Sequence, residues 1–174
     1  LSLTPSAPGA LALRNLEPDD PPSEAWRFRE TVMTAMTAMI PVLARAFAGL
    51  RIVVRPHPSE NHQRWRQAAA GLANVEVVHE GTVAPWLMAA SCAVHNGCTT
   101  AIEGRLVGTP VVAYRPVTSP DYEVELPNQV GATAVDPDGL VATVRALIGG
   151  GRPLPLKAAE RATLAPYIAA LDGP

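Results

Sequence analysis

Apolar residues recur along this chain in short continuous runs, which alternate with longer stretches of three- and four-residue spacing. The short runs predict strands buried on both faces, and the periodic stretches predict amphipathic helices. The predicted strands are residues 51–55, 75–78, 92–95, 111–114 and 132–135, with a further candidate at 10–14. Because strands and helices alternate, we predict an α/β fold: a single Rossmann-like, doubly wound parallel sheet of about five or six strands, with helices on both faces.

The helix boundaries follow from residues that favour caps and stops. Ser23 is the expected N-cap of a long helix that Pro41 should kink, and Ser59 is the expected N-cap of a helix over 60–70. In the central strand–helix–strand unit, Thr99 and Thr100 are expected to cap a helix that ends at Gly108. Shorter helices are predicted at 85–90, at 137–147 after the cap Asp136, and at 157–171 with an interruption at Pro166.

The chain divides into three regions by composition. Residues 1–22 are rich in proline and are interpreted as a poorly ordered lead-in or linker, 23–150 as the Rossmann-like domain, and 151–174 as a linker and terminal helix. Residues 118–131 are expected to form a surface loop that could close over a site as a lid. Because the chain begins at Leu1, without a methionine, we expect a fragment or domain of a longer protein.

Composition excludes several classes of function. With a net charge of −2 and 5% aromatic residues, the chain offers neither a broad basic surface nor stacking platforms for nucleic acid. No run approaches the roughly 20 apolar residues of a membrane helix. Cys92 and Cys98 are expected to be reduced thiols of a cytoplasmic protein. The chain has no dinucleotide fingerprint, no phosphate-binding P-loop, no nucleophile elbow and no metal-ligand spacing, so we expect neither a metal nor a cofactor.

Three polar loops follow predicted strands, at 55–59, 79–82 and 96–100. In a doubly wound sheet, the carboxyl ends of the strands border the ligand crevice. Asn96–Gly97 is a turn signal, and free N–H groups at the start of the next helix favour an anion such as phosphate. The crevice is predicted to contain Arg55, His57, His79, Glu80, Gly81, Asn96, Gly97, Thr99, Thr100 and Glu103.

The histidines receive different interpretations. His57 lies between two prolines and is either a loop histidine that hydrogen-bonds the backbone or the best candidate in this chain for a phosphate contact or a proton transfer, although no catalytic residue is assigned. His79 is either a site residue or a side chain solvated beside Glu80. His95 is interpreted as a core or rim histidine with satisfied nitrogens, and His62 is given no role.

Three motifs together resemble a known family. They are Arg-Pro-His-Pro-Ser-Glu at 55–60, His-Glu-Gly-Thr-Val with Pro-Trp-Leu at 79–87, and His-Asn-Gly-Cys-Thr-Thr-Ala-Ile-Glu with Gly-Thr-Pro-Val-Val at 95–112. Over residues 50–148 the chain resembles bacterial surface carbohydrate biosynthesis proteins, which are similar to the carboxyl-terminal half of GT-B glycosyltransferases. The resemblance implies a domain that binds a nucleotide-sugar donor for polysaccharide synthesis.

The resemblance also implies roles for individual residues. Thr99 and Thr100 would receive the donor phosphate, and Glu103 would accept hydrogen bonds from the ribose. His57 and Pro58 match a His-Pro pair that contacts the nucleotide phosphate in some transferases using CMP-activated sugars. The donor is expected to be CMP- or UDP-linked, and its sugar, the acceptor and the stereochemical outcome stay open.

A GT-B enzyme also needs an amino-terminal acceptor domain, which this chain is too short to contain. We therefore expect binding without turnover by this chain alone, and any peripheral contact with the inner face of the membrane through the missing half. Two alternatives remain: half of a sugar-nucleotide 2-epimerase, and a non-catalytic nucleotide- or phosphate-binding or assembly module.

Overall fold

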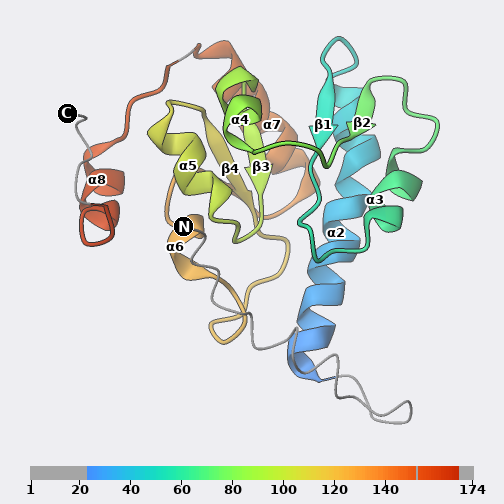
Figure 1. Ribbon diagram of the computed structural model, residues 1–174, viewed down its shortest axis with the longest axis horizontal. Coiled ribbons are helices and arrows are strands. Elements are labelled where there is room, and N and C mark those ends of the chain that lie inside the picture. Colours follow the sequence, from blue (N-terminus) through green and yellow to red (C-terminus); the bar gives the residue numbers. More distant parts are fainter. Residues whose placement is uncertain (1–22, 152, 169–174) are drawn as a thin grey trace.

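The computed structural model describes residues 23–151 and 153–168, in which helices alternate with short parallel strands (Figure 1). The predicted strand at 10–14 lies outside these residues. In chain order the elements are α2 (Glu24–Ala46), β1 (Ile52–Val54), α3 (His62–Ala69), β2 (Val75–Val77), α4 (Ala84–Ala89), β3 (Ala93–His95), α5 (Thr100–Leu106), β4 (Val111–Tyr114), α6 (Glu125–Asn128), β5 (Ala132–Ala134), α7 (Pro137–Gly149) and α8 (Ala158–Leu164).

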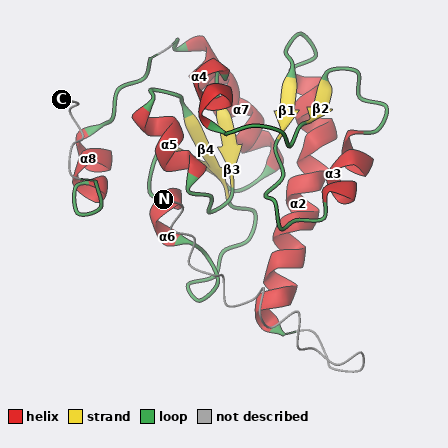
Figure 2. Cartoon of the chain, in the orientation of Figure 1, coloured by secondary structure: helices red, strands yellow, loops and turns green. Residues whose placement is uncertain are grey.

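The five described strands form two parallel sheets, not the single sheet that the sequence predicts. β1 pairs with β2, with Ile52 opposite Val75, and the second sheet has the order β3-β4-β5, with Ala93 opposite Val111. In the view of Figure 1, β1 lies between β2 and β3, but no ladder joins β1 to β3. Figure 2 shows how short the strands are beside the helices. Apolar runs identify segments that become strands, whereas pairing between neighbouring edges depends on tertiary packing that the runs do not encode.

The core lies on both faces of the three-stranded sheet. Successive strand residues point to opposite faces, so Val111 and Val112 enter different clusters. Val112, 0% exposed, packs with Met39 of α2 and Leu140 of α7. Val111 packs on the other face with Ala101 of α5 and Leu164 of α8. Helices therefore cover both faces of this sheet, as the sequence predicts.

Two of the predicted N-caps form, at Ser23 and Asp136, and the cap predicted at Ser59 does not. The Ser23 and Asp136 side chains accept hydrogen bonds from the backbone N–H groups of Trp26 and Gly139, as expected. The prediction for Ser59 is wrong, because α3 begins later and Asn61 is its N-cap. α2 stays helical from Glu24 to Ala46 with Pro41 inside it.

The last described helix, α8, is anchored to the domain by a buried ion pair. Arg105, 2% exposed, donates from Nε and Nη2 to the two carboxylate oxygens of Glu160, at 2.7 and 3.0 Å. Its remaining N–H groups donate to three backbone carbonyls, those of Thr109, Leu154 and Pro155. All five guanidinium donors are therefore used, and Leu164 is fully buried beside them.

No helix within the described residues combines the length and the apolar character needed to cross a membrane.

Candidate functional site

Arg55 joins the loops that follow β1 and β2. Its two terminal nitrogens donate to the carbonyl oxygens of Glu80 and Gly81, at 3.0 and 2.9 Å. Its guanidinium carbon also lies 5.3 Å from the centre of the Trp86 ring, within the range of a cation–π contact. These carbonyl oxygens accept two of the five guanidinium N–H groups and carry no formal charge, so neither contact neutralises the positive charge of Arg55 at this edge of the two-stranded sheet.

The hydrogen bonds of His57 identify its neutral tautomer. Its Nδ1 atom receives the backbone N–H of Ser59 at 3.2 Å and lies 2.7 Å from the Ser59 hydroxyl oxygen. A backbone N–H can only donate, so Nδ1 must carry the lone pair and the neutral ring must carry its proton on Nε2. His57 is exposed. The ring can therefore offer an N–H donor from Nε2 to an anionic or carbonyl oxygen.

His62, to which the sequence assigns no role, contacts two of the predicted site residues. Its ring lies edge-on to the His79 ring, with centroids 4.4 Å apart, and its Nε2 donates to the carbonyl oxygen of His57 at 3.0 Å. The structure thus brings three histidines together where β1 and β2 end. The signal for His62 was its place at the first position of α3, from which a side chain can reach back to the preceding loop.

Two carboxylates flank this histidine group. Glu60 accepts from the backbone N–H of His57 at 3.1 Å and from Nε1 of Trp65 at 2.9 Å. The Glu80 pKa is lowered, because its own backbone N–H and that of His79 stabilise the carboxylate. A phosphate bound here would therefore lie near the positive charge of Arg55 and the imidazole N–H donors. It would also lie near the carboxylates of Glu60 and Glu80.

The turn between β3 and α5 is held by two asparagines. Gly97 has φ +58°, a left-handed conformation that suits glycine. Asn96 donates from Nδ2 to the Tyr114 carbonyl oxygen at 2.8 Å, and the Gly97 N–H donates to Oδ1 of Asn128 at 2.9 Å. Asn128 lies within the predicted surface loop, on the short helix α6, and no local sequence pattern marks it as a site residue.

Thr99 and Thr100 do not cap α5, which corrects the sequence prediction. Thr99 occupies the N-cap position but already has helical backbone angles, φ −60° and ψ −20°, and its side chain makes no capping hydrogen bond. The Thr100 hydroxyl donates to Sγ of Cys98 at 3.0 Å. Glu103 is exposed in the first turn of this seven-residue helix. These polar groups line the turn, but the short helix alone provides little dipole for an anion.

His95 differs from its prediction as a satisfied histidine. It is 6% exposed at the end of β3, and neither ring nitrogen has a hydrogen-bond partner within the described residues. Burial penalises the charged form and lowers the pKa of His95 to about 4. The ring is therefore neutral at pH 7, and two buried polar atoms lack the compensation that such atoms usually have.

The predicted residues form two groups, one around Arg55 and His57 and one around the Asn96–Thr100 turn. Each group follows the carboxyl end of parallel strands. Within the described part of the chain, no hydrogen bond, ion pair or ring contact joins one group to the other. The sequence expectation of one crevice shared by both groups therefore stays a prediction.

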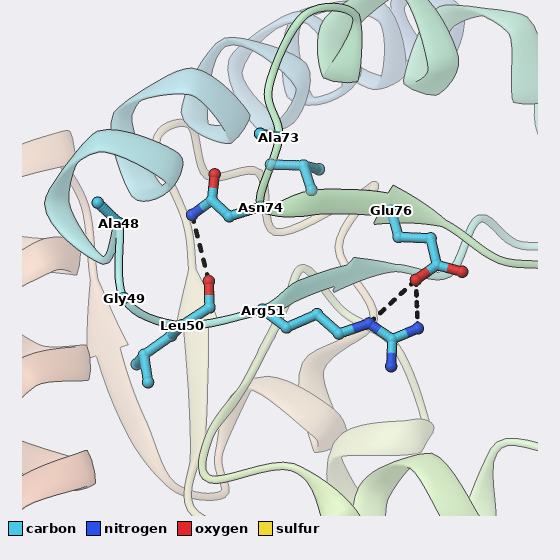
Figure 3. A pocket seen from close by; sticks show the side chains of 8 residues that line it. Ala48, Gly49, Leu50, Arg51, Ala73, Asn74 and Glu76 are labelled. Carbon is cyan, nitrogen blue, oxygen red and sulfur yellow. Dashed lines mark hydrogen bonds and ion pairs between the residues drawn. The ribbon is translucent and has the colours of Figure 1, made fainter.

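A hollow of about 330 Å³ lies at the opposite edge, where β1 and β2 begin (Figure 3). Asn74 donates there to the carbonyl oxygens of Ala44, Phe47 and Leu50 at 3.1–3.2 Å, which closes the carboxyl end of α2. Arg51 and Glu76 form an exposed ion pair beside it. Because these polar groups are paired with one another, the hollow offers few free partners to a ligand.

Among the described residues, no three His, Cys, Asp or Glu side chains are grouped so as to hold a metal ion. Comparison with known proteins found no matching family model, curated protein or solved structure.

Proposed function

We propose that this chain is the donor-binding domain of a glycosyltransferase that makes bacterial surface polysaccharide. In this proposal it represents the carboxyl-terminal, Rossmann-like half of a GT-B fold, and it binds a CMP- or UDP-linked sugar in the cytoplasm. The acceptor and the second half of the active site would come from an amino-terminal domain.

One observation carries the proposal. Each of the three motif loops directly follows a parallel strand: 55–61 follows β1, 78–83 follows β2 and 96–99 follows β3. Ligands of open α/β sheets bind outside the carboxyl ends of their strands. The motifs that resemble sugar-nucleotide enzymes thus occupy the edge where such a ligand is expected.

The proposed contacts use the chemistry of each group. Arg55 supplies a positive charge and His57 an N–H donor from Nε2, both suited to phosphate oxygens. Glu103 is exposed one turn into α5, where its carboxylate can accept hydrogen bonds from ribose hydroxyls. Thr99 and Thr100 would turn their hydroxyls to the ligand, which for Thr100 means giving up the contact with Cys98.

Calorimetric and thermal-shift titrations with CMP, UDP, CDP and GDP test this function. We expect one nucleotide to bind, and a ligand at one hundred times its Kd to add about 2.7 kcal/mol of stability. His57→Ala and Glu103→Ala should each weaken binding about tenfold or more. Glu76→Ala is the matched control for Glu103→Ala, because it removes an exposed glutamate at the opposite edge of the strands.

The same titrations separate the alternatives. Preference for CMP or UDP with dependence on both site residues supports the transferase donor site. Binding of a UDP-sugar together with interconversion at C2, once the missing half is present, would favour the epimerase. A folded chain that binds no nucleotide, alone or within a longer parent protein, would contradict the proposal and favour an assembly role.

A further inference from the structure

The Asn96–Thr100 turn depends on a residue far away in the sequence. Oδ1 of Asn128 accepts the Gly97 N–H at 2.9 Å across a separation of 31 residues. Asn128 is only 9% exposed, and Gly97 adopts φ +58° at this contact. A Cβ atom on Gly97 would lie 3.5 Å from Cβ of Val124, so the segment before α6 packs directly against the turn.

An ion pair orients the Asn128 carboxamide. Arg115 donates from Nε and Nη2 to the two oxygens of Glu123, at 2.8 and 2.7 Å, and this hydrogen bonding lowers the pKa of Glu123. The same carboxylate lies 3.5 Å from Nδ2 of Asn128. A carboxylate attracts the amide NH₂ and repels the amide oxygen, so Oδ1 is directed toward Gly97.

We propose that Asn128 is a positioning residue for the nucleotide site, because it fixes the left-handed Gly97 and thereby sets where Thr99, Thr100 and Glu103 lie. This inference rests on the proposed donor site. It gives residues 115–128 a role in forming the turn, through the contacts of Arg115, Glu123 and Asn128.

Asn128 acts on the shape of the turn more than on its stability. Gly97 can adopt many backbone conformations, and a single hydrogen bond from its N–H selects one of them. Asn96 restrains the preceding residue through the Tyr114 carbonyl oxygen at 2.8 Å. Without Asn128 the turn keeps only one of these two restraints. The backbone conformation at Gly97 is then no longer fixed, and the positions of the site residues that follow it vary.

The test compares Asn128→Ala with the double variant Glu123→Gln/Asn128→Asp. Asp keeps an oxygen at the Oδ1 position that can accept the Gly97 N–H, whereas Ala cannot, and Glu123→Gln replaces the carboxylate that would repel the second Asp oxygen by an amide that can donate to it. Gln129→Ala is the control, because Gln129 is exposed on the adjacent position and bonds only locally to Glu125 in the described structure. Two quantities are measured for each variant: the Kd of the nucleotide that the parent chain binds, and the hydrogen-exchange rate of the Gly97 amide.

We expect Asn128→Ala to raise the Kd about tenfold and to speed Gly97 exchange at least tenfold. The double variant Glu123→Gln/Asn128→Asp should restore both to within about threefold of the parent values, and Gln129→Ala should change neither. A purely structural residue would lower the melting temperature without this rescue pattern. If Asn128→Ala binds nucleotide as tightly as the parent chain, the inference is overturned while the proposed function stands.

Failure of the proposed function can also be distinguished from failure of the role inferred for Asn128. If the unsubstituted chain binds no nucleotide, either alone or within a longer parent protein, the proposed function fails, and Gly97 exchange alone decides whether Asn128 positions the turn. Exchange that is unchanged in Asn128→Ala overturns that role. Faster exchange that the double variant Glu123→Gln/Asn128→Asp reverses supports it.

Discussion

Arg105 and Glu160 form a buried ion pair in which every donor of the guanidinium and both carboxylate oxygens are used. Oε1 of Glu160 also accepts the Gly131 N–H at 2.8 Å, and Oε2 accepts the Lys157 N–H at 2.7 Å. The pair therefore connects α5, the start of β5 and the beginning of α8. Despite the opposing effect of burial, the hydrogen bonds from Arg105, Lys157 and Gly131 hold the Glu160 pKa at about 2.

Breaking this pair should be strongly destabilising. We expect Arg105→Met or Glu160→Gln to lower the free energy of unfolding by about 3–5 kcal/mol, because each leaves a buried charge without its partner. The exposed pair Arg51–Glu76 provides the control, and Arg51→Met should cost about 1 kcal/mol or less. Urea unfolding followed by circular dichroism measures the free energy of unfolding of all three variants. If Arg105→Met loses no more of it than Arg51→Met, the account of the buried pair is contradicted.

His95 should make the fold sensitive to mild acid. Its pKa is about 4 in the folded chain and 6.5 without burial, so between these values the unfolded chain binds the proton and the folded chain does not. The stability linked to uncharged His95 is therefore fully present above pH 6.5. The free energy of unfolding then falls by up to about 3 kcal/mol as the pH drops to 4. The measurement is the free energy of unfolding at half-unit steps from pH 7.5 to 3.5.

Replacing His95 separates this effect from other acid-sensitive groups. His95→Leu should remove the loss between pH 6.5 and 4, and it should raise stability at pH 7 by eliminating two unpaired polar atoms. The loss from Glu160 should remain, because a lowered carboxylate pKa costs stability only as the pH falls from 4.5 toward 2. An unchanged pH profile in His95→Leu would show that another group titrates.

His62 should restrain the loop after β1. His62→Phe keeps a ring against His79 but loses the hydrogen bond to the His57 carbonyl oxygen, which also accepts the Glu60 N–H at 2.9 Å. We expect faster hydrogen exchange at the Glu60 amide and a stability loss of about 1 kcal/mol, the usual net value of one hydrogen bond. Gln63→Ala, on the next position of α3, should leave that amide unchanged. If both variants exchange alike, His62 does not hold the loop.

Gly131 should tolerate no side chain. It has φ +82°, and a Cβ atom there would overlap the carbonyl oxygen and the side chain of Val111. Gly131→Ala is expected to cost at least about 2 kcal/mol, since strain and a backbone clash combine. Gly49→Ala is the control, because nothing lies within 4 Å of its Cβ position. Thermal unfolding measures the melting temperatures of the two variants. Similar values would contradict the expected clash at Gly131.

Local patterns predicted much of the fold. Val111–Tyr114 is a strand because four consecutive buried residues suit a sheet covered on both faces, and Ser23 and Asp136 cap helices through neighbouring backbone N–H groups. Thr99 failed as a cap because its own backbone is already helical. Local residue preferences indicate which side chains can cap a helix, but the backbone conformation of the folded chain determines which of them does so.

Local sequence patterns could not predict the long-range contacts that shape the site. Asn128 meets Gly97 across 31 residues, and Glu160 meets Arg105 across 55. Residue identity alone gives no sign of such partners, since each depends on how two distant segments pack. The same reason explains why the sequence predicted one sheet, whereas β1 and β3 are not paired.

The most direct test of the donor site is a backbone amide chemical-shift titration of the chain with CMP and with UDP. The account predicts that one nucleotide shifts the amides of residues 57–60, 79–83 and 96–100, which follow β1, β2 and β3. Shifts confined to residues 48–51 and 73–76, around the hollow at the opposite edge, would contradict it. So would a spectrum that neither nucleotide changes, both for this chain alone and within a longer parent protein.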